Sequence, residues 1–246
     1  MRLDSPVLRL AYLTDGTPAG VDLLSGERVI ATRAIVSNLT IWDTFGKLIG
    51  PARTPREISA QLKRFTGWGV YQMFLVINES ALSRLPAEKI LMLTAVQPEG
   101  ASDPQAAQLV LSVAPAGAGP PDGSHRTAVL SRYTRAEDWF SFHEDHTAHE
   151  ERDQSALEQV WSRLHAAMPE LGDGIELIET ATPQTYYDMT RRRFGMIGRA
   201  SGASVAAQPI TSPFPNLWLV GDTVADGVGL EGVVESAWRT ALEIVG

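Results

Sequence analysis

The chain has 246 residues and no cysteine, and its counts of Lys+Arg (21) and Asp+Glu (29) give a formal net charge of −8. The length fits one large domain or two small ones, and the lack of cysteine excludes disulfides, thiolate nucleophiles and cysteine-ligated metal sites. The negative charge argues against a nucleic-acid partner. No apolar run approaches the roughly 20 residues that span a bilayer, and the first residues lack the apolar core of a signal peptide, so we expect a cytoplasmic protein.

Short strands separated by turns are expected over the first fifty residues. Asp15-Gly16 and Ser25-Gly26 are turn signals between apolar stretches, which predicts a small β-meander. The apolar run at residues 34–36 is too short and too apolar for a surface strand, so we expect an inner strand of a mostly parallel sheet. Residues 47–56, which are rich in Gly and Pro, are expected to form a connection to the next segment.

The middle of the chain predicts an antiparallel sheet followed by helices. Four apolar stretches recur at intervals of roughly 18 to 20 residues, which suits antiparallel strands joined by generous loops. Two helices with one polar face, a fifth strand and a helix that starts at Thr182-Pro183 are expected next. The strands are expected at residues 71–78, 89–96, 108–114, 127–134 and 174–179, and the two helices at residues 137–149 and 154–168.

The end of the chain carries the sharpest local pattern. A buried strand at residues 217–220 is followed by Gly221-Asp222 and then by residues 227–232 (GVGLEG), which have the spacing G-x-G-x-x-G. The dinucleotide fingerprint also needs a return strand and an acidic residue about twenty positions later, and the chain ends before there is room for either. The ordinary fingerprint is therefore excluded. The local pattern fits a turn that approaches a ligand and a plain strand-to-helix turn equally well.

Residues 217–241 (LWLVGDTVADGVGLEGVVESAWRTA) resemble the closing segment of the flavin-dependent amine-oxidase-fold proteins. The nearest branch is the phytoene desaturase and carotenoid desaturase-isomerase family, and residues 21–38, 67–75 and 180–198 resemble further segments of it. The resemblance implies FAD as the cofactor, with Asp222 on its ribityl or phosphate side and the Gly-rich turn against its ring. The cofactor-binding residues that it implies are Gly221, Asp222, Gly227, Gly229, Leu230, Glu231, Gly232 and Val233; Glu231 stands where the family usually has proline.

The same resemblance implies the fold. We expect an α/β protein with α+β character in the middle, in which a partial FAD-binding, Rossmann-like domain carries an inserted antiparallel-sheet substrate domain. Residues 1–49 would be a remnant of the FAD domain, residues 50–198 the substrate-binding domain, and residues 199–246 the closing strand and helix of the FAD domain. Trp68 and Phe74 would line an apolar substrate site.

The function that the resemblance implies is that of an FAD-dependent oxidoreductase of the desaturase type, acting on an apolar, isoprenoid substrate. No side chain is nominated as catalytic, because the flavin carries the hydride chemistry in such enzymes. Residues 1–60 contain no fingerprint for the ADP half of FAD, so the cofactor site is expected to be incomplete in this chain alone. A second polypeptide with the missing N-terminal half, or self-association, is expected, as is contact with the periphery of a membrane. A non-catalytic subunit that binds lipid or protein is the alternative.

Two other clusters are weaker candidates. His143, His146 and His149 recur every three residues, but on a helix the third lies about 240° round from the first, so the three cannot converge on one ion. A solvated helix face is favoured and no metal site is expected. Arg191-Arg192-Arg193 fits a solvated turn or a partner contact better than an anion site. The absence of a G-x-S-x-G nucleophile elbow argues against a serine hydrolase.

Overall fold

The computed structural model describes residues 1–85, 90–94, 108–115, 123–140, 146–200, 211–224, 227–228 and 230–246. Contacts between Cα atoms divide the chain into two compact units. The first unit comprises residues 1–68 and 196–246, and the second comprises residues 69–195. The functional division expected at residues 49 and 198 stays a prediction, because compactness does not test what each segment binds.

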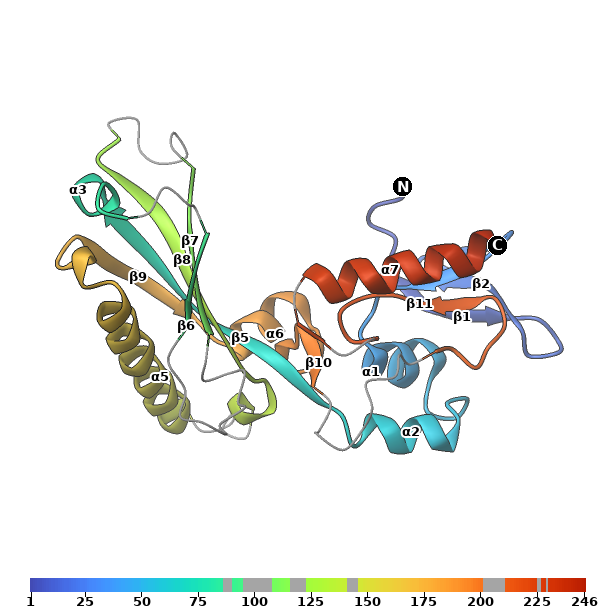
Figure 1. Cartoon of the computed structure of the whole chain (residues 1–246). Coiled ribbons are helices and arrows are strands. Elements are labelled where there is room, and N and C mark those ends of the chain that lie inside the picture. Colours follow the sequence, from blue (N-terminus) through green and yellow to red (C-terminus); the bar gives the residue numbers. More distant parts are fainter. Residues whose placement is uncertain are drawn as a thin grey trace. The chain divides into compact units, whose positions relative to one another are not determined.

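Two small sheets lie within the first unit (Figure 1). An antiparallel meander contains β1 (Val7–Tyr12), β2 (Pro18–Leu23) and β3 (Arg28–Ile30). A parallel pair contains β4 (Ile35–Ser37) and β11 (Leu217–Leu219). The expected meander and the parallel pairing of the expected strand are therefore confirmed. The expectation of an inner strand is wrong among the described residues, because β4 pairs with β11 alone and the side chain of Val36 is exposed. The two strands of the pair come from opposite ends of the sequence.

The expected connection at residues 47–56 is confirmed at its centre, where residues 50–55 form no helix or strand. Helices flank it. α1 (Ile41–Asp43) continues into a π-helical segment, η1 (Thr44–Ile49), and α2 (Arg56–Leu62) follows the connection. Apolar side chains at four-residue spacing, Ile41, Phe45 and Ile49, are buried on one face of the first helical segment.

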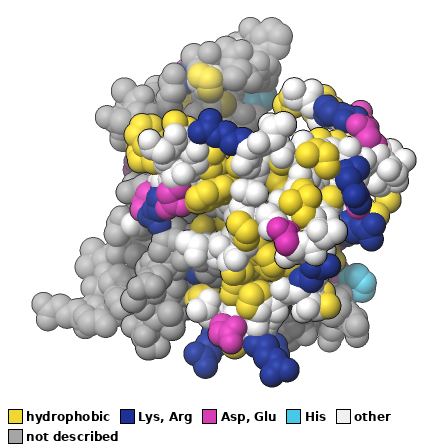
Figure 2. Space-filling view, turned by 90° about the vertical axis from the view of Figure 1, so that its right-hand side faces the viewer, with side chains coloured by type: hydrophobic (Ala, Val, Ile, Leu, Met, Phe, Trp, Pro, Cys, Tyr) yellow, Lys and Arg dark blue, Asp and Glu magenta, His cyan; other side chains and the backbone are white. Residues whose placement is uncertain are grey.

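The last helix, α7 (Leu230–Val245), has an unusual distribution of side chains. Two small polar residues, Ser236 and Thr240, are buried, whereas large apolar residues on another face are exposed. The exposed apolar residues are Val234, Trp238, Leu242 and Val245, which we call the α7 stripe. Figure 2 views the molecule from the right-hand side of Figure 1. It shows hydrophobic side chains among Lys and Arg side chains on that face. An uncovered apolar stripe of this kind is typical of a surface that meets a partner.

The second unit is built on an antiparallel sheet, as expected. Its strands are β6 (Ile90–Thr94), β7 (Gln108–Val113), β8 (His125–Arg135) and the longer part of β5 (Thr66–Asn78), in that order, with β9 (Ile175–Ala181) also paired to β5. The pairings of β6 with β7, β7 with β8 and β5 with β9 are antiparallel. Shorter elements in this unit are α3 (Glu79–Leu82), η2 (Glu137–Trp139), η3 (Pro169–Leu171), α6 (Pro183–Thr190) and η4 (Arg193–Gly195).

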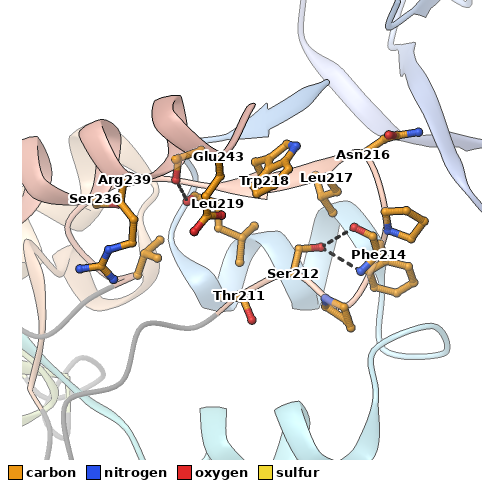
Figure 3. A pocket seen from close by; sticks show the side chains of 14 residues that line it. Thr211, Ser212, Phe214, Asn216, Leu217, Trp218, Leu219, Ser236, Arg239 and Glu243 are labelled. Carbon is orange, nitrogen blue, oxygen red and sulfur yellow. Dashed lines mark hydrogen bonds between the residues drawn. The ribbon is translucent and has the colours of Figure 1, made fainter. Parts of the chain in front are cut away.

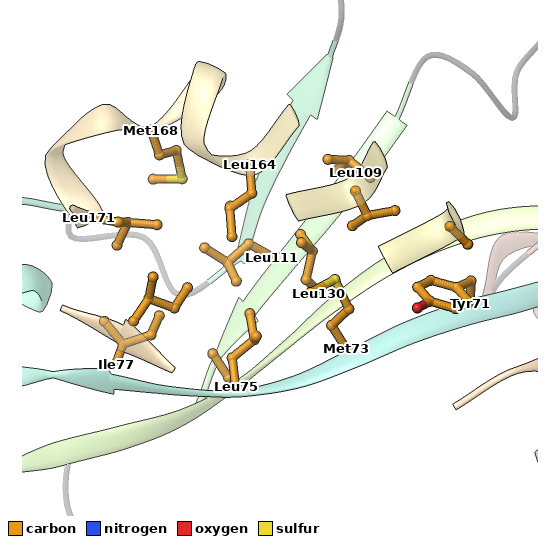
Figure 4. Packing of buried hydrophobic residues seen from close by; sticks show 14 of the residues in the cluster. Tyr71, Met73, Leu75, Ile77, Leu109, Leu111, Leu130, Leu164, Met168 and Leu171 are labelled. Carbon is orange, nitrogen blue, oxygen red and sulfur yellow. The ribbon is translucent and has the colours of Figure 1, made fainter. Parts of the chain in front are cut away.

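One long helix, α5 (His146–Ala167), packs on the sheet of the second unit (Figure 4). Residues 137–139 form a 3-10 turn and residues 146–167 form an unbroken helix, so the expected division into two helices was wrong. No Gly or Pro lies within residues 146–167, and therefore nothing in the sequence breaks the helix there. The core between helix and sheet includes Tyr71, Met73, Leu75, Ile77, Leu109, Leu111, Leu130, Val160 and Leu164.

A buried polar group ties α5 to the sheet. Tyr71 Oη donates to Asp153 Oδ1 at 2.8 Å, and Thr180 Oγ1 donates to Asp153 Oδ2 at 2.9 Å. The Tyr71 ring also stacks on Trp139, with 5.6 Å between ring centroids. Burial and the bond to Asp153 raise the pKa of Tyr71. One carboxylate thus satisfies hydroxyls from two strands, β5 and β9.

We therefore expect Asp153→Ala to lower the stability of the second unit by about 1–3 kcal/mol, because two part-buried hydroxyls lose a charged acceptor. Asp153→Asn should lose less, because the amide oxygen still accepts one bond. Thermal unfolding of the purified chain measures both. The control is Glu150→Ala on the exposed side of the same helix, and an equal loss in that variant would contradict the assignment.

Candidate functional site

The carboxyl ends of β4 and β11 lie together, because the two strands are parallel and in register from Ile35 with Leu217 to Ser37 with Leu219. The pairing extends one residue further, where Val220 N donates to Ser37 O at 2.9 Å. In open α/β sheets, ligands bind outside the carboxyl ends of parallel strands. The expected Gly-Asp turn is the segment that leaves β11 at this edge.

Hydrogen bonds fix that turn on both sides. Gly221 has φ +121°, a conformation that favours glycine, and its N–H donates to Ser236 Oγ of α7 at 3.1 Å. Thr223 Oγ1 accepts from the backbone N–H of Ile41 at 3.0 Å, at the start of α1. Asp222 lies between them, half-buried. The turn is therefore held against two helices, and Asp222 is carried at its apex.

The start of α7 leaves room beside the backbone. A Cβ built on Gly232 has no heavy atom within 4 Å, and the φ angle of this residue is not positive. Neither packing nor backbone conformation requires glycine at this position, although glycine costs about 1 kcal/mol relative to alanine in a helix. Val233, the next residue, is half-buried. Gly229 lies outside the described residues, and Leu230 and Glu231 belong to the first turn of α7.

A narrow three-stranded strip brings a predicted substrate residue near predicted cofactor residues. β10 (Gly198–Ala200) pairs with β12 (Gly227–Val228) on one side and with the first residues of β5 on the other. Trp68, Gly198 and Val228 stand in direct register across the three strands. Because neighbouring strands lie about 4.8 Å apart, the backbones of Trp68 and Val228 are about 10 Å apart.

The next set of paired residues across the same three strands contains a residue that the sequence analysis did not single out. Arg199 stands between Gly67 and Gly227, so both of its cross-strand neighbours are glycines. Its side chain is buried, with 1% of its surface exposed, and Cζ lies 4.5 Å from the centroid of the Phe65 ring. A single arginine carries no sequence signal of burial, because the pairing partners of β10 come from distant segments.

Phe74, the other predicted substrate residue, lies in the second unit, so the structure does not place it in the same compact unit as Trp68. It is half-buried on β5, between the core residues Met73 and Leu75. Gln72, two residues before Phe74 on the same strand, links two side chains by hydrogen bonds. Tyr186 Oη donates to Gln72 Oε1, and Gln72 Nε2 donates to Ser131 Oγ at 2.8 Å. Burial raises the pKa of Tyr186.

The histidines that the sequence singled out do not form a cluster among the described residues. His146 is exposed at the start of α5, and the His149 ring lies edge-on to Trp139 with 5.7 Å between centroids. His143 lies outside the described residues. No group of three potential metal ligands is found in the described part of the chain.

A pocket of about 410 Å³ that the sequence did not predict lies beside α7 (Figure 3). Residues 211–219 form one wall, and Ser236, Arg239, Thr240 and Glu243 of α7 form the other. Thr240 Oγ1 donates to Leu219 O at 3.2 Å at its base. None of the predicted cofactor residues that the structure describes lines this pocket, although Ser236 both lines it and accepts from Gly221 N of the turn.

The residues at the edge fit part of a flavin. The open space at Gly232 is a cradle that a Cβ would fill, and the backbone N–H groups in the first turn of a helix point toward its N-terminal end, where carbonyl oxygens or anions bind. The carboxylate of Asp222 is a hydrogen-bond acceptor, and its role toward the cofactor stays a prediction. The residues present therefore suit the ribityl and ring portions of FAD, and the assignment of the individual residues stays a prediction.

No protein-family model matches the chain. Among curated proteins, it is 26% identical over 232 residues to prolycopene isomerase 2, chloroplastic, of an Oncidium hybrid cultivar, a match that covers 91% of this chain and 38% of the relative. It is also 26% identical over 233 residues to the prolycopene isomerase of Daucus carota, covering 90% of this chain and 36% of the relative. The chain thus spans less than half the length of the curated relatives that it matches.

Solved structures give the same picture of the fold. An oxidoreductase from Methanosarcina mazei matches with a TM-score of 0.63 at 15% identity, over 97% of this chain and 49% of that one. A putrescine oxidase redesigned in its cofactor binding matches with a TM-score of 0.54 at 13% identity, over 98% and 48%. Within the described residues, no helix has the length and apolarity to cross a membrane. The chain is thus similar in sequence to prolycopene isomerases, and its fold is similar to that of oxidoreductases that include a putrescine oxidase.

Proposed function

We propose that the chain is the flavin- and substrate-binding part of an FAD-dependent oxidoreductase that acts on an apolar, isoprenoid substrate. The observation that carries the proposal is the edge of the β4–β11 pair, where Gly221, Asp222 and the open start of α7 converge. The similarity to prolycopene isomerases supports the choice of substrate class.

In this proposal the chain binds and orients, while bound FAD supplies the hydride chemistry. Asp222 accepts a hydrogen bond from a ribityl hydroxyl, and the residues from Gly227 to Val233 lie against the ring system. The side chain of Trp68 forms part of the wall on the substrate side, since its strand is two strands away from Val228. An aromatic wall suits a long apolar chain and keeps water away from the ring.

The proposal includes a second polypeptide that carries the ADP-binding half. The chain covers 49% and 48% of two solved proteins that have a similar fold. The α7 stripe and the exposed Val36 of β4 are apolar surfaces available for such a contact. A parallel sheet is usually covered on both faces and has more than two strands, so the β4–β11 pair also supports it.

A non-catalytic subunit that binds lipid or protein is the second candidate. The observation in its favour is that the second unit has its own core and sheet, and therefore does not depend on a bound flavin for its packing. Flavin binding by the complete assembly separates the two candidates.

The first prediction concerns FAD. The chain alone should bind FAD weakly, because contacts to the pyrophosphate and adenosine are missing and each charged contact contributes about 1–3 kcal/mol. Titration of the purified chain with FAD, followed by flavin fluorescence, measures the affinity. Asp222→Ala should weaken it about tenfold or more, and His146→Ala, on an exposed helix turn, should leave it unchanged. Tight stoichiometric FAD on the lone chain would contradict the missing-half proposal, and no binding up to millimolar FAD, with or without a partner, would contradict the function.

The second prediction compares two glycines of the candidate site. Gly221→Ala should destabilise the first unit by about 1–3 kcal/mol, because its φ of +121° is strained for any side chain. Gly232→Ala should keep or slightly raise the melting temperature, because its Cβ meets open space and alanine favours the helix. FAD affinity should nevertheless fall in Gly232→Ala, since the methyl group takes the space of the flavin. If Gly232→Ala raised the melting temperature and left the FAD affinity unchanged, the flavin ring would have to bind elsewhere.

The third prediction concerns the α7 stripe. The lone chain should self-associate at high micromolar concentration, because a partner surface is uncovered. Trp238→Glu should shift it toward the monomer without loss of melting temperature, as measured by light scattering and thermal unfolding. Ile178→Glu, at an exposed apolar residue of β9, is the matched control and should have no such effect. A strictly monomeric wild-type chain would count against the proposed contact surface.

A further inference from the structure

The pocket beside α7 has two walls that contacts within the chain hold in place. The first wall, residues 211–217, contains two prolines, which restrict the backbone. Ser212 Oγ accepts from Phe214 N at 3.1 Å within this wall. Asn216 O accepts from Ile35 N at 2.8 Å, which fastens the wall to the start of β4. The shape of this side of the pocket is therefore set by the fold.

The second wall is one face of α7, and it is fastened to β11 and to the turn that follows. Ser236 Oγ accepts from Gly221 N at 3.1 Å. Thr240 Oγ1 donates to Leu219 O at 3.2 Å. The volume between the walls, about 410 Å³, lies in the range of about 300–1,000 Å³ that is typical of small-molecule sites. Because both walls are already held, a ligand orders little of the chain when it binds.

The lining of the pocket combines an apolar part with a charged part (Figure 3). The apolar side chains come from the first wall and from β11 with its turn, and the charged ones come from α7. The apolar part includes Phe214, Leu217, Leu219 and Val224, and the charged part is Arg239 and Glu243. Such a lining suits a small molecule that has an apolar body and one polar group.

The charge that remains at the pocket is negative. Arg239 forms an ion pair with Glu235, one helical turn before it, so the charge of the arginine is compensated. The Glu243 carboxylate has no ion pair or hydrogen bond to any residue that the structure describes. Arg33, a basic residue at the same end of α7, donates to Ile244 O at 2.8 Å instead. Glu243 therefore leaves a negative charge at the pocket of a chain whose formal net charge is −8.

We propose that this pocket binds a small cationic amphiphile, that is, an ammonium group on an apolar body the size of an aromatic ring. The ring contacts Phe214 and Leu219, and the ammonium group pairs with the carboxylate of Glu243. Removal of the ring from water drives binding, and the charge pair selects cations over neutral and anionic molecules of the same shape. The site is independent of the proposed flavin site, because the pocket forms without a cofactor.

Other classes of ligand fit the pocket less well. An anion would meet the carboxylate of Glu243, and Arg239 already has a carboxylate partner in Glu235. A long apolar chain would cover the charged groups of Arg239 and Glu243 without offering them a polar partner, which is costly. A nucleotide would add further negative charge beside Glu243. An amine is the class whose charge the pocket complements.

Three probes with the same ring and different charge test the selectivity of the pocket. They are 2-phenylethylamine, 2-phenylethanol and phenylacetate, and titration of the purified chain with each is followed by ligand-observed NMR at neutral pH. The amine should bind about fivefold more tightly than the alcohol, the acid should bind most weakly, and added salt should reduce the differences. Equal affinity for the amine and the alcohol, or tighter binding of phenylacetate, overturns the proposal.

Two substitutions in the pocket separate the charge from the shape. Glu243→Gln should abolish the preference for the amine over the alcohol and leave the affinity for the alcohol unchanged. Phe214→Ala should weaken both probes to the same degree, because the ring loses an apolar contact. Glu57→Gln, at an exposed acid of α2, removes the same charge outside the pocket and should keep the preference. Thermal unfolding checks that each variant is folded, and an equal loss of preference in Glu57→Gln overturns the assignment to Glu243.

Backbone NMR of the ¹⁵N-labelled chain shows whether the amine binds in this pocket. Ser236 lines the pocket and accepts from Gly221 N, so the amide resonance of Gly221 should shift as 2-phenylethylamine is added. The amide of Gly16, in a turn of the meander that does not line the pocket, is the matched control and should not shift. Binding of the amine without a shift at Gly221 would place it elsewhere and overturn the proposal.

Discussion

Parallel pairing of β4 with β11 is the constraint on which the candidate site depends. It joins residues 35–37 to residues 217–219, so that the loops after both strands leave the sheet at one edge. Gly221 N then donates to Ser236, and Thr223 accepts from the N–H of Ile41, which adds α7 and α1 to the same edge. Loss of this pairing would separate Asp222 from both helices. The site is therefore a product of contacts between the two ends of the chain.

In α7 small polar residues are buried and large apolar residues are exposed, and this distribution follows from what the helix packs against. Its buried face meets β11 through Thr240, which donates to Leu219 O, and through Ser236, which accepts from Gly221 N. Small residues with hydroxyl groups allow a close approach of helix and strand and satisfy backbone groups that the two-stranded pair leaves over. The apolar residues of the helix are left on the other side, where they are exposed. The same helix thus serves the proposed cofactor site and the proposed contact with a partner.

The two units carry different parts of the proposed function. The first unit holds all the described residues that were predicted to bind the cofactor, together with Trp68. The second unit has a core of its own under α5, where Asp153 satisfies Tyr71 and Thr180, and it carries Phe74 on its sheet.

The sequence by itself predicted many of the local elements and a resemblance to a family. Turn signals at Asp15-Gly16 and Ser25-Gly26 and the apolar run before Asn38 predicted the meander and β4, and the strand–Gly–Asp–helix order predicted the end of the chain. Tertiary structure alone decided which residues meet. β10 was not predicted, because three residues carry too little pattern, yet its pairing sets Trp68 in line with Val228 and encloses Arg199 between two glycines. Such contacts join segments far apart in the chain, and periodicity reports only on neighbours in sequence.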